Sequence, residues 1–148
     1  ELIEHPPPRS TWIPETLNMA VYLAAADSFF ETDEAFLQWV YEVGEAVFRS
    51  PMYRILMLVA SPERLAKGAV HRWSAFHRGS AYELERVYWG TVSTIAYPRN
   101  LFPKLGVQAT SMAIQAAYRA CGARRAKVDV IEWKPTQATI RSVWHPQG

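Results

Sequence analysis

A chain of 148 residues, 49% of them hydrophobic and 20% charged, has the composition of one globular domain and excludes a low-complexity tail. Its formal net charge is only +2, and its single cysteine cannot form an internal bridge, which excludes a disulfide-stapled secreted fold. No stretch approaches the roughly 20 apolar residues of a membrane span, and the N-terminus lacks a signal-peptide pattern. We therefore predict a cytoplasmic protein without a membrane span.

The first part of the chain predicts an arm followed by helices. Residues 1–11 contain three consecutive prolines, which favour extended geometry, so we predict a Pro-rich arm ahead of a single domain over residues 12–148. Pro14 suits the first turn of a helix. Thr32 is a favourable N-cap for a second helix that continues through Phe48.

A short apolar run follows over residues 53–59. Its pattern is consistent with a buried helix but does not separate a helix from a strand. Ser61 and Pro62 then supply a cap and a first-turn proline for another helix. If the short run is helical, the N-terminal half contains about four helices.

The apolar spacing changes near Gly79 from a period of about 3.6 to a period of about 2, which is typical of strands. We predict two strands or one long kinked strand over residues 82–95, with Gly90 as a bulge or a tight turn. The helical period returns over residues 107–121, and Gly122 is expected to end that helix.

Two final strands are expected over residues 127–133 and 138–144, joined by a turn that contains Pro135. Helices that are segregated from an antiparallel sheet define the α+β class. We therefore predict about four N-terminal helices, then an antiparallel sheet with a late helix packed across it.

Three tryptophans sit at or near the ends of predicted strands, opposite a late helix that is rich in alanine. Plain packing of large against small side chains explains this arrangement, and an apolar cavity between sheet and helix is the alternative. Polar side chains nearby would then anchor a small apolar ligand. The candidate ligand-binding residues are Trp89, Trp133, Trp144, Tyr118, Arg86 and Arg141.

Catalytic and metal-binding patterns are weak. His71 and His77 are six positions apart, which does not suit a metal site on a helix, so we predict no metal and no cofactor. Cys121 lies on an apolar stripe and is predicted to be structural. Glu83 and Glu85 share one strand face and, with His77, define an enzymatic hypothesis that ranks last behind an ordinary solvated face.

The small net charge conceals a division along the chain. Residues 1–48 carry nine acids and one base, a balance of −8, whereas residues 49–148 carry fifteen bases and five acids, a balance of +10. We expect the acidic helices to offset the basic remainder, within one molecule or across a dimer. The alternative is a nucleic-acid-binding module that uses the basic C-terminal two-thirds.

A series of short motifs runs along the chain in a recognisable order. The motifs are Trp12-Ile13-Pro14-Glu15, Tyr53 to Leu58, Ser61-Pro62 before Trp73, Tyr97-Pro98, Gly106, and a closing strand that ends in Trp144. This order resembles an uncharacterised domain family abundant in myxobacteria. The layout of that family is similar to the group that holds haem-nitric-oxide-binding domains, 4-vinyl-reductase domains and small subunits of vesicle-tethering complexes.

The resemblance implies helices followed by a twisted antiparallel sheet with a late helix across it, frequent dimerisation, and binding more than catalysis. No haem ligand carries over, because the chain has no Tyr-x-Ser-x-Arg motif after a histidine, and one cysteine cannot supply the cluster of the reductase domains. We therefore predict a non-catalytic sensory or adaptor domain, a homodimer, that binds a small apolar ligand or a partner protein in signalling or regulation.

Overall fold

The computed structural model describes residues 12–144, so the expected Pro-rich arm lies outside the described residues. The α+β class is confirmed, with helices first, then an antiparallel sheet and a late helix across it. The elements are α1 (Glu15–Phe29), α2 (Asp33–Arg49), α3 (Pro51–Val59), α4 (Pro62–Phe76), β1 (Ala81–Val87), β2 (Gly90–Ala96), α5 (Lys104–Ala120), β3 (Lys127–Lys134) and β4 (Gln137–Val143).

The N-terminal helices begin where the local chemistry places them. The Thr32 hydroxyl accepts the backbone N–H of Ala35 at 3.2 Å, and the Ser61 hydroxyl accepts that of Arg64 at 3.3 Å, as expected for N-caps. The apolar run whose type was open is helical, because Pro51 starts α3. The prediction that this run is buried is wrong for most of its side chains, since Met57 is the one buried residue of α3.

The first strand region consists of two strands, β1 and β2, joined by a tight turn at Tyr88 and Trp89. Gly90 opens β2 with a φ of 153°. A Cβ at this position would collide with the carbonyl oxygen of Ser142 on the neighbouring strand. Glycine is therefore required here by both the backbone conformation and the close approach of β4.

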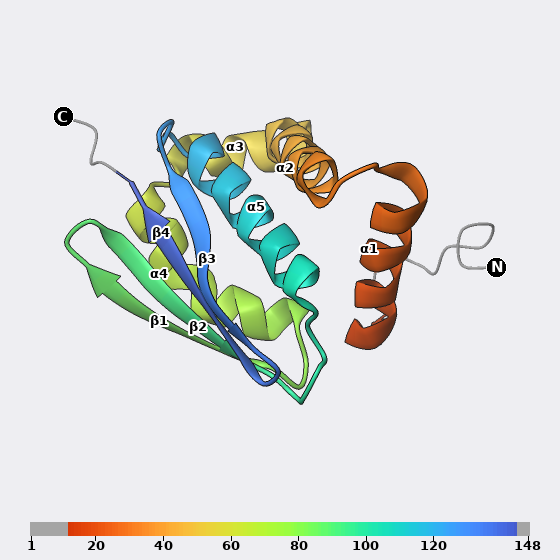
Figure 1. Ribbon diagram of the computed structural model, residues 1–148. Helices are drawn as coiled ribbons and strands as arrows, with labels where there is room; N and C mark the ends of the chain where they lie inside the picture. Colours follow the sequence, from red (N-terminus) through yellow and green to blue (C-terminus); the bar gives the residue numbers. More distant parts are fainter. Residues whose placement is uncertain (1–11, 145–148) are drawn as a thin grey trace.

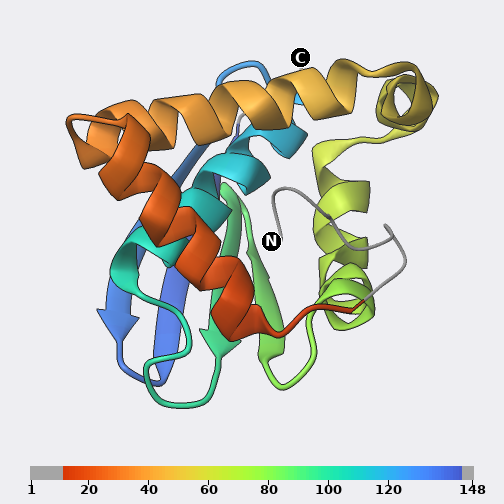
Figure 2. The same cartoon turned by 90° about the vertical axis from the view of Figure 1, so that its right-hand side faces the viewer.

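The four strands form one antiparallel sheet in the order β1-β2-β4-β3. Helices α4 and α5 pack against one face of the sheet, and α2 packs on the side of α5 that faces away from it (Figure 1). Helix α3 lies at the C-terminal end of α2, where the chain turns toward α4 (Figure 2). The other face of the sheet carries exposed side chains such as Glu83 and Glu85.

Two groups of buried side chains hold these layers together. The larger lies between the sheet, α4 and α5, and the smaller lies between α1, α2 and the outer side of α5. Fully buried members of the larger group include Ile95, Phe102, Val107, Val128 and Ile140. No helix within residues 12–144 has both the length and the apolar character needed to cross a bilayer.

The division of charge is only partly offset by direct pairing. Among the described residues, the acids of α1 and α2 form ion pairs in two places, Glu45 with Arg49 and Glu15 with His77. Helix α2 therefore joins α5 mainly through apolar contacts rather than through acidic and basic partners. The acidic helices do pack against the basic part of the chain, but no network of ion pairs joins the described residues of the two parts.

Candidate functional site

Four of the predicted ligand-binding residues lie at one end of the sheet, namely Arg86, Trp89, Tyr118 and Trp144. Tyr118 on α5 and Trp144 after β4 are buried, and their rings stack with centroids 4.8 Å apart. The Trp144 indole N–H donates to Oε1 of Glu63 at 3.1 Å, and its backbone N–H donates to the Trp89 carbonyl at 3.2 Å. Hydrogen bonds, the strongest from its own backbone N–H, together with the charge of Arg86, lower the pKa of Glu63.

The other two predicted residues lie apart from this group. Trp133 is at the opposite end of the sheet, where its indole N–H donates to the Phe102 carbonyl at 3.0 Å. Arg141 is on the uncovered face and pairs with Asp129 at 3.4 Å. The six residues therefore do not converge on one site, and a ligand site between sheet and helix stays a prediction.

The polar groups of the packed interior are in non-reactive states. Burial raises the pKa of Tyr118 to about 12 and the pKa of the Cys121 thiol to about 11, so both groups are protonated near neutral pH. Within the described part of the chain, no three His, Cys, Asp or Glu side chains are grouped so that they could hold a metal ion.

The residues of the enzymatic hypothesis are divided between two places. Glu83 and Glu85 are exposed on the uncovered face of β1, whereas His77 ends α4 and places Nδ1 3.0 Å from Oε2 of Glu15. The His77 ring also stacks on Trp73 with centroids 3.8 Å apart. This histidine therefore holds the start of α1 against the end of α4, a contact between residues 62 positions apart that sequence spacing did not reveal.

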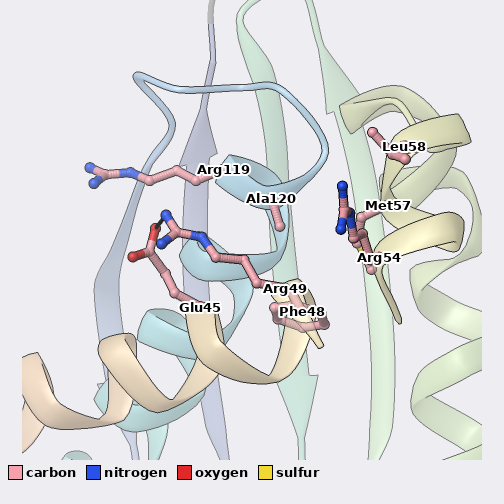
Figure 3. A pocket seen from close by; sticks show the side chains of 8 residues that line it. All are labelled: Glu45, Phe48, Arg49, Arg54, Met57, Leu58, Arg119 and Ala120. Atoms are coloured by element: carbon pink, nitrogen blue, oxygen red, sulfur yellow. Dashed lines mark hydrogen bonds and ion pairs between the residues drawn. The ribbon is translucent and has the colours of Figure 1, made fainter. Parts of the chain in front are cut away.

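A pocket of about 190 Å³ lies where α2, α3 and α5 meet. Figure 3 shows Arg54 rising from α3 on one side and the pair of Glu45 and Arg49 from α2 on the other, with Phe48 at the base. The eight lining residues are Glu45, Phe48, Arg49, Arg54, Met57, Leu58, Arg119 and Ala120. The site thus combines three guanidinium groups and one carboxylate with an apolar base.

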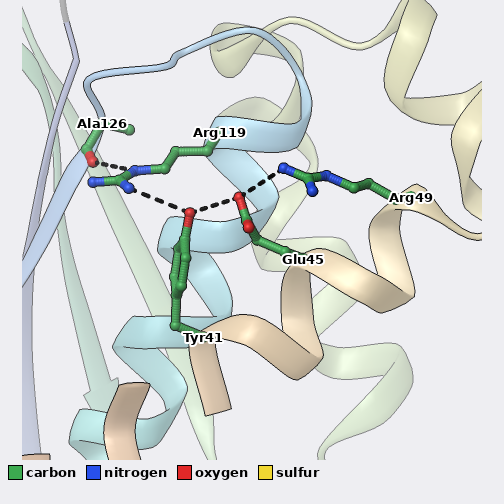
Figure 4. A network of polar contacts seen from close by, with 5 residues as sticks. All are labelled: Tyr41, Glu45, Arg49, Arg119 and Ala126. Carbon is green, nitrogen blue, oxygen red and sulfur yellow. Dashed lines mark hydrogen bonds and ion pairs between the residues drawn. The ribbon is translucent and has the colours of Figure 1, made fainter. Parts of the chain in front are cut away.

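A chain of polar contacts occupies most of the charged groups of this pocket (Figure 4). The Tyr41 hydroxyl donates to Oε1 of Glu45 at 2.7 Å, and the same oxygen accepts from Arg49 at 3.3 Å. Arg119 donates to the Tyr41 hydroxyl at 3.3 Å and to the Ala126 carbonyl at 3.2 Å. Burial, together with the Glu45 hydrogen bond, raises the pKa of Tyr41, so its phenol remains a donor.

The Arg54 guanidinium differs from the other two in the pocket, because it makes no ion pair or hydrogen bond to any described residue (Figure 3). Arg54 is exposed, and it is the one charged residue of α3. The sequence contained a signal here, because a single arginine interrupts a run of apolar residues. Sequence reasoning missed the site because its arginines come from three separate helices.

The outer side of α3 is an apolar stripe made by Met52, Ile55, Leu56 and Val59. These positions are spaced i, i+3, i+4 and i+7, so they share one face of the helix. Their residues are between 55% and 73% exposed. We call these four residues the α3 stripe.

Arg54 and Leu58 are one helical turn apart and lie between the α3 stripe and the pocket. Leu58 lines the pocket and is 76% exposed, so it extends the apolar surface to the pocket rim. The stripe and the pocket are therefore neighbouring parts of one surface. The chain matches no protein-family model, no curated protein and no solved structure, so this surface is understood from its own geometry alone.

Proposed function

We propose that this domain is a non-catalytic adaptor that binds a partner protein through the α3 stripe, in signalling or regulation. The observation that carries the proposal is a nine-residue helix with five large apolar side chains exposed and one residue buried. Contiguous apolar surface of this kind marks interaction sites in proteins. Covering such a side chain contributes roughly 1.5–3 kcal/mol when it is fully buried.

The shape of the site favours a macromolecular partner over a small apolar ligand. The pocket beside α3 has a volume of about 190 Å³, whereas pockets for drug-sized ligands are typically about 300–1,000 Å³. The α3 stripe lies on the outer side of a helix, so it can contact a second surface but cannot enclose a small molecule. A partner protein matches that geometry better.

The basic residues of the uncovered sheet face give the nucleic-acid alternative less support. Asp129 pairs with Lys127 at 3.2 Å and with Arg141 at 3.4 Å, and Glu132 pairs with Lys134 at 2.8 Å. Binding to phosphates depends on unpaired lysine and arginine side chains. We therefore favour the protein partner, and retardation of nucleic acid at about 50 mM salt is the result that would reverse this choice.

A photo-crosslinking residue placed at position 52 tests the proposal in the cells that produce the protein. Met52 is 70% exposed at the start of the α3 stripe, so a seated partner lies within reach of the crosslinker. We expect a discrete protein adduct from position 52 and none from position 83, which is exposed on the sheet. An adduct of two identical chains identifies the partner as a second copy. The absence of any protein adduct at position 52 contradicts the proposal.

A further inference from the structure

We propose that the pocket between α2, α3 and α5 takes a carboxylate of the partner, so that the segment bound on α3 is an acidic amphipathic peptide. This inference rests on the proposed function, because it names the partner of the same surface. Apolar side chains of the peptide cover the α3 stripe and Leu58, and an aspartate or glutamate side chain pairs with Arg54.

The charge of the pocket is the first reason. Three arginines face one glutamate, and Oε1 of Glu45 is already bonded to Tyr41 and Arg49. Arg119 is held by Tyr41 and the Ala126 carbonyl. The Arg54 guanidinium keeps five N–H donors that have no partner among the described residues. An added carboxylate supplies what this guanidinium lacks.

The surroundings of Arg54 make such a pair stronger than one on an open surface. Phe48 and Met57 line the pocket near it, and they exclude part of the water that otherwise screens a pair of charges. Arginine binds carboxylates through two parallel N–H bonds, which adds geometric selectivity. The pocket, at about 190 Å³, has room for one side chain of a peptide but not for a bulky lipid headgroup.

The position of Arg54 allows one short segment to reach both parts of the surface. Helix α3 has nine residues and is therefore about 13 Å long. Leu58 is three residues from Ile55 and adjoins the α3 stripe, and Arg54 is one turn from Leu58 on the flank of α3 that leads to the pocket. A partner helix of two or three turns, about 11–16 Å long, can then place apolar side chains on the stripe and an acid in the pocket.

The acidic side chains of α2 favour a peptide over an anionic membrane. Helix α2 packs directly against α3, and the C-terminal half of α2, which is nearer to α3, carries Glu42 and Glu45 with one base, Arg49. A broad anionic surface laid on α3 would also approach these acids and be repelled. A single carboxylate in the pocket approaches three arginines and one glutamate, so the net charge around it is positive.

A library of random linear peptides displayed on phage provides the probe, with the full chain as the target. We expect enriched peptides to combine an aspartate or glutamate with large apolar residues. A labelled copy of an enriched peptide is then titrated by fluorescence anisotropy. Replacing its acid by the matching amide should weaken binding about tenfold or more, the usual effect of losing a charged hydrogen-bonded pair.

Variants of the protein separate the inference from the proposed function. Arg54→Gln should weaken the peptide about tenfold. The matched control Arg99→Gln removes the same charge from an exposed loop before α5 and should change binding by less than about twofold, because exposed distant charges contribute little. Unchanged thermal unfolding of both variants shows that the fold is intact.

Each remaining outcome has a defined meaning. Peptides that need Ile55 but bind Arg54→Gln and wild type equally overturn the carboxylate pocket and leave the adaptor function standing. If no enriched peptide is sensitive to Ile55→Ser, both proposals are overturned. Binding to phosphatidylserine vesicles that requires Ile55 and Arg54 would replace the acidic peptide by a lipid surface.

Discussion

The sheet end around Tyr118 and the outer side of α3 are both rich in large apolar side chains, yet they differ in what they lack. At the sheet end the rings of Tyr118 and Trp144 are stacked and buried, and the Trp144 indole N–H has an acceptor in Glu63. On α3 most of the apolar side chains are exposed, and the Arg54 guanidinium has no partner among the described residues. The stacked rings and the indole N–H of the first region already have partners within the chain, although the buried Thr91 hydroxyl nearby has none among the described residues. The exposed large apolar side chains of α3 are not covered by any described residue.

This difference shows why apolar composition alone does not locate a binding site. The sequence placed a candidate ligand site at strand-end tryptophans and a buried element over residues 53–59. In the structure the indole N–H groups of Trp144 and Trp133 donate hydrogen bonds to acceptors in the same chain. The side chains of the short apolar run are mostly exposed to solvent. A functional surface is found by asking which groups remain uncovered, and that depends on contacts between distant segments.

The largest effect is expected from Trp144→Ala. Removing a buried aromatic side chain leaves a cavity and should lower the free energy of unfolding by about 3–5 kcal/mol, measured by denaturant titration. Trp133→Ala is the control, because that side chain is already 36% exposed and should cost roughly half as much. A loss below about 1 kcal/mol for Trp144→Ala would show that the sheet end is not a packed core.

The second effect distinguishes binding from stability. Ile55→Ser should change the free energy of unfolding by less than about 0.5 kcal/mol, because an exposed side chain loses little on truncation. The same change should lower partner affinity by about 2 kcal/mol, as truncation of an interface anchor does, and should reduce the crosslinked adduct at position 52. Phe29→Ser serves as the control, since Phe29 is 80% exposed on α1 and should leave the adduct unchanged. Destabilisation by Ile55→Ser without loss of the adduct would reverse the roles assigned to the two regions.

Much of the fold was predictable because its signals are local. Thr32 and Ser61 cap their helices, and Gly122 ends α5 with a φ of 103° as expected. The two final strands pair close to their expected bounds. Each of these features depends on a residue and its near neighbours, which a sequence pattern records directly.

The candidate site was not predictable because its parts come together only on folding. Glu45, Arg54 and Arg119 belong to three helices, and their grouping follows from how α2 packs on α5. The exposure of α3 was also hidden, because a run that is apolar on every side gives no indication of which side is covered. Only the single arginine within the run marked it as unlike a buried helix.

The smallest effect concerns a polar contact between α1 and α4 whose groups are already partnered within the chain. Glu15 accepts hydrogen bonds from His77 and from Asn18, and chiefly the His77 bond lowers the pKa of Glu15 below its ordinary value of 4.5. A carboxylate with a lowered pKa stabilises the fold fully above its unfolded pKa, and this contribution is lost as the pH falls below about 4.5. Glu15→Gln should therefore cost about 1 kcal/mol at neutral pH, and the difference from wild type should shrink as the pH falls below that value. Denaturant unfolding at several pH values measures this, with the exposed Glu85→Gln as the control. If the difference in the free energy of unfolding between wild type and Glu15→Gln stays constant through the acid range, the charge of Glu15 does not hold α1 against α4.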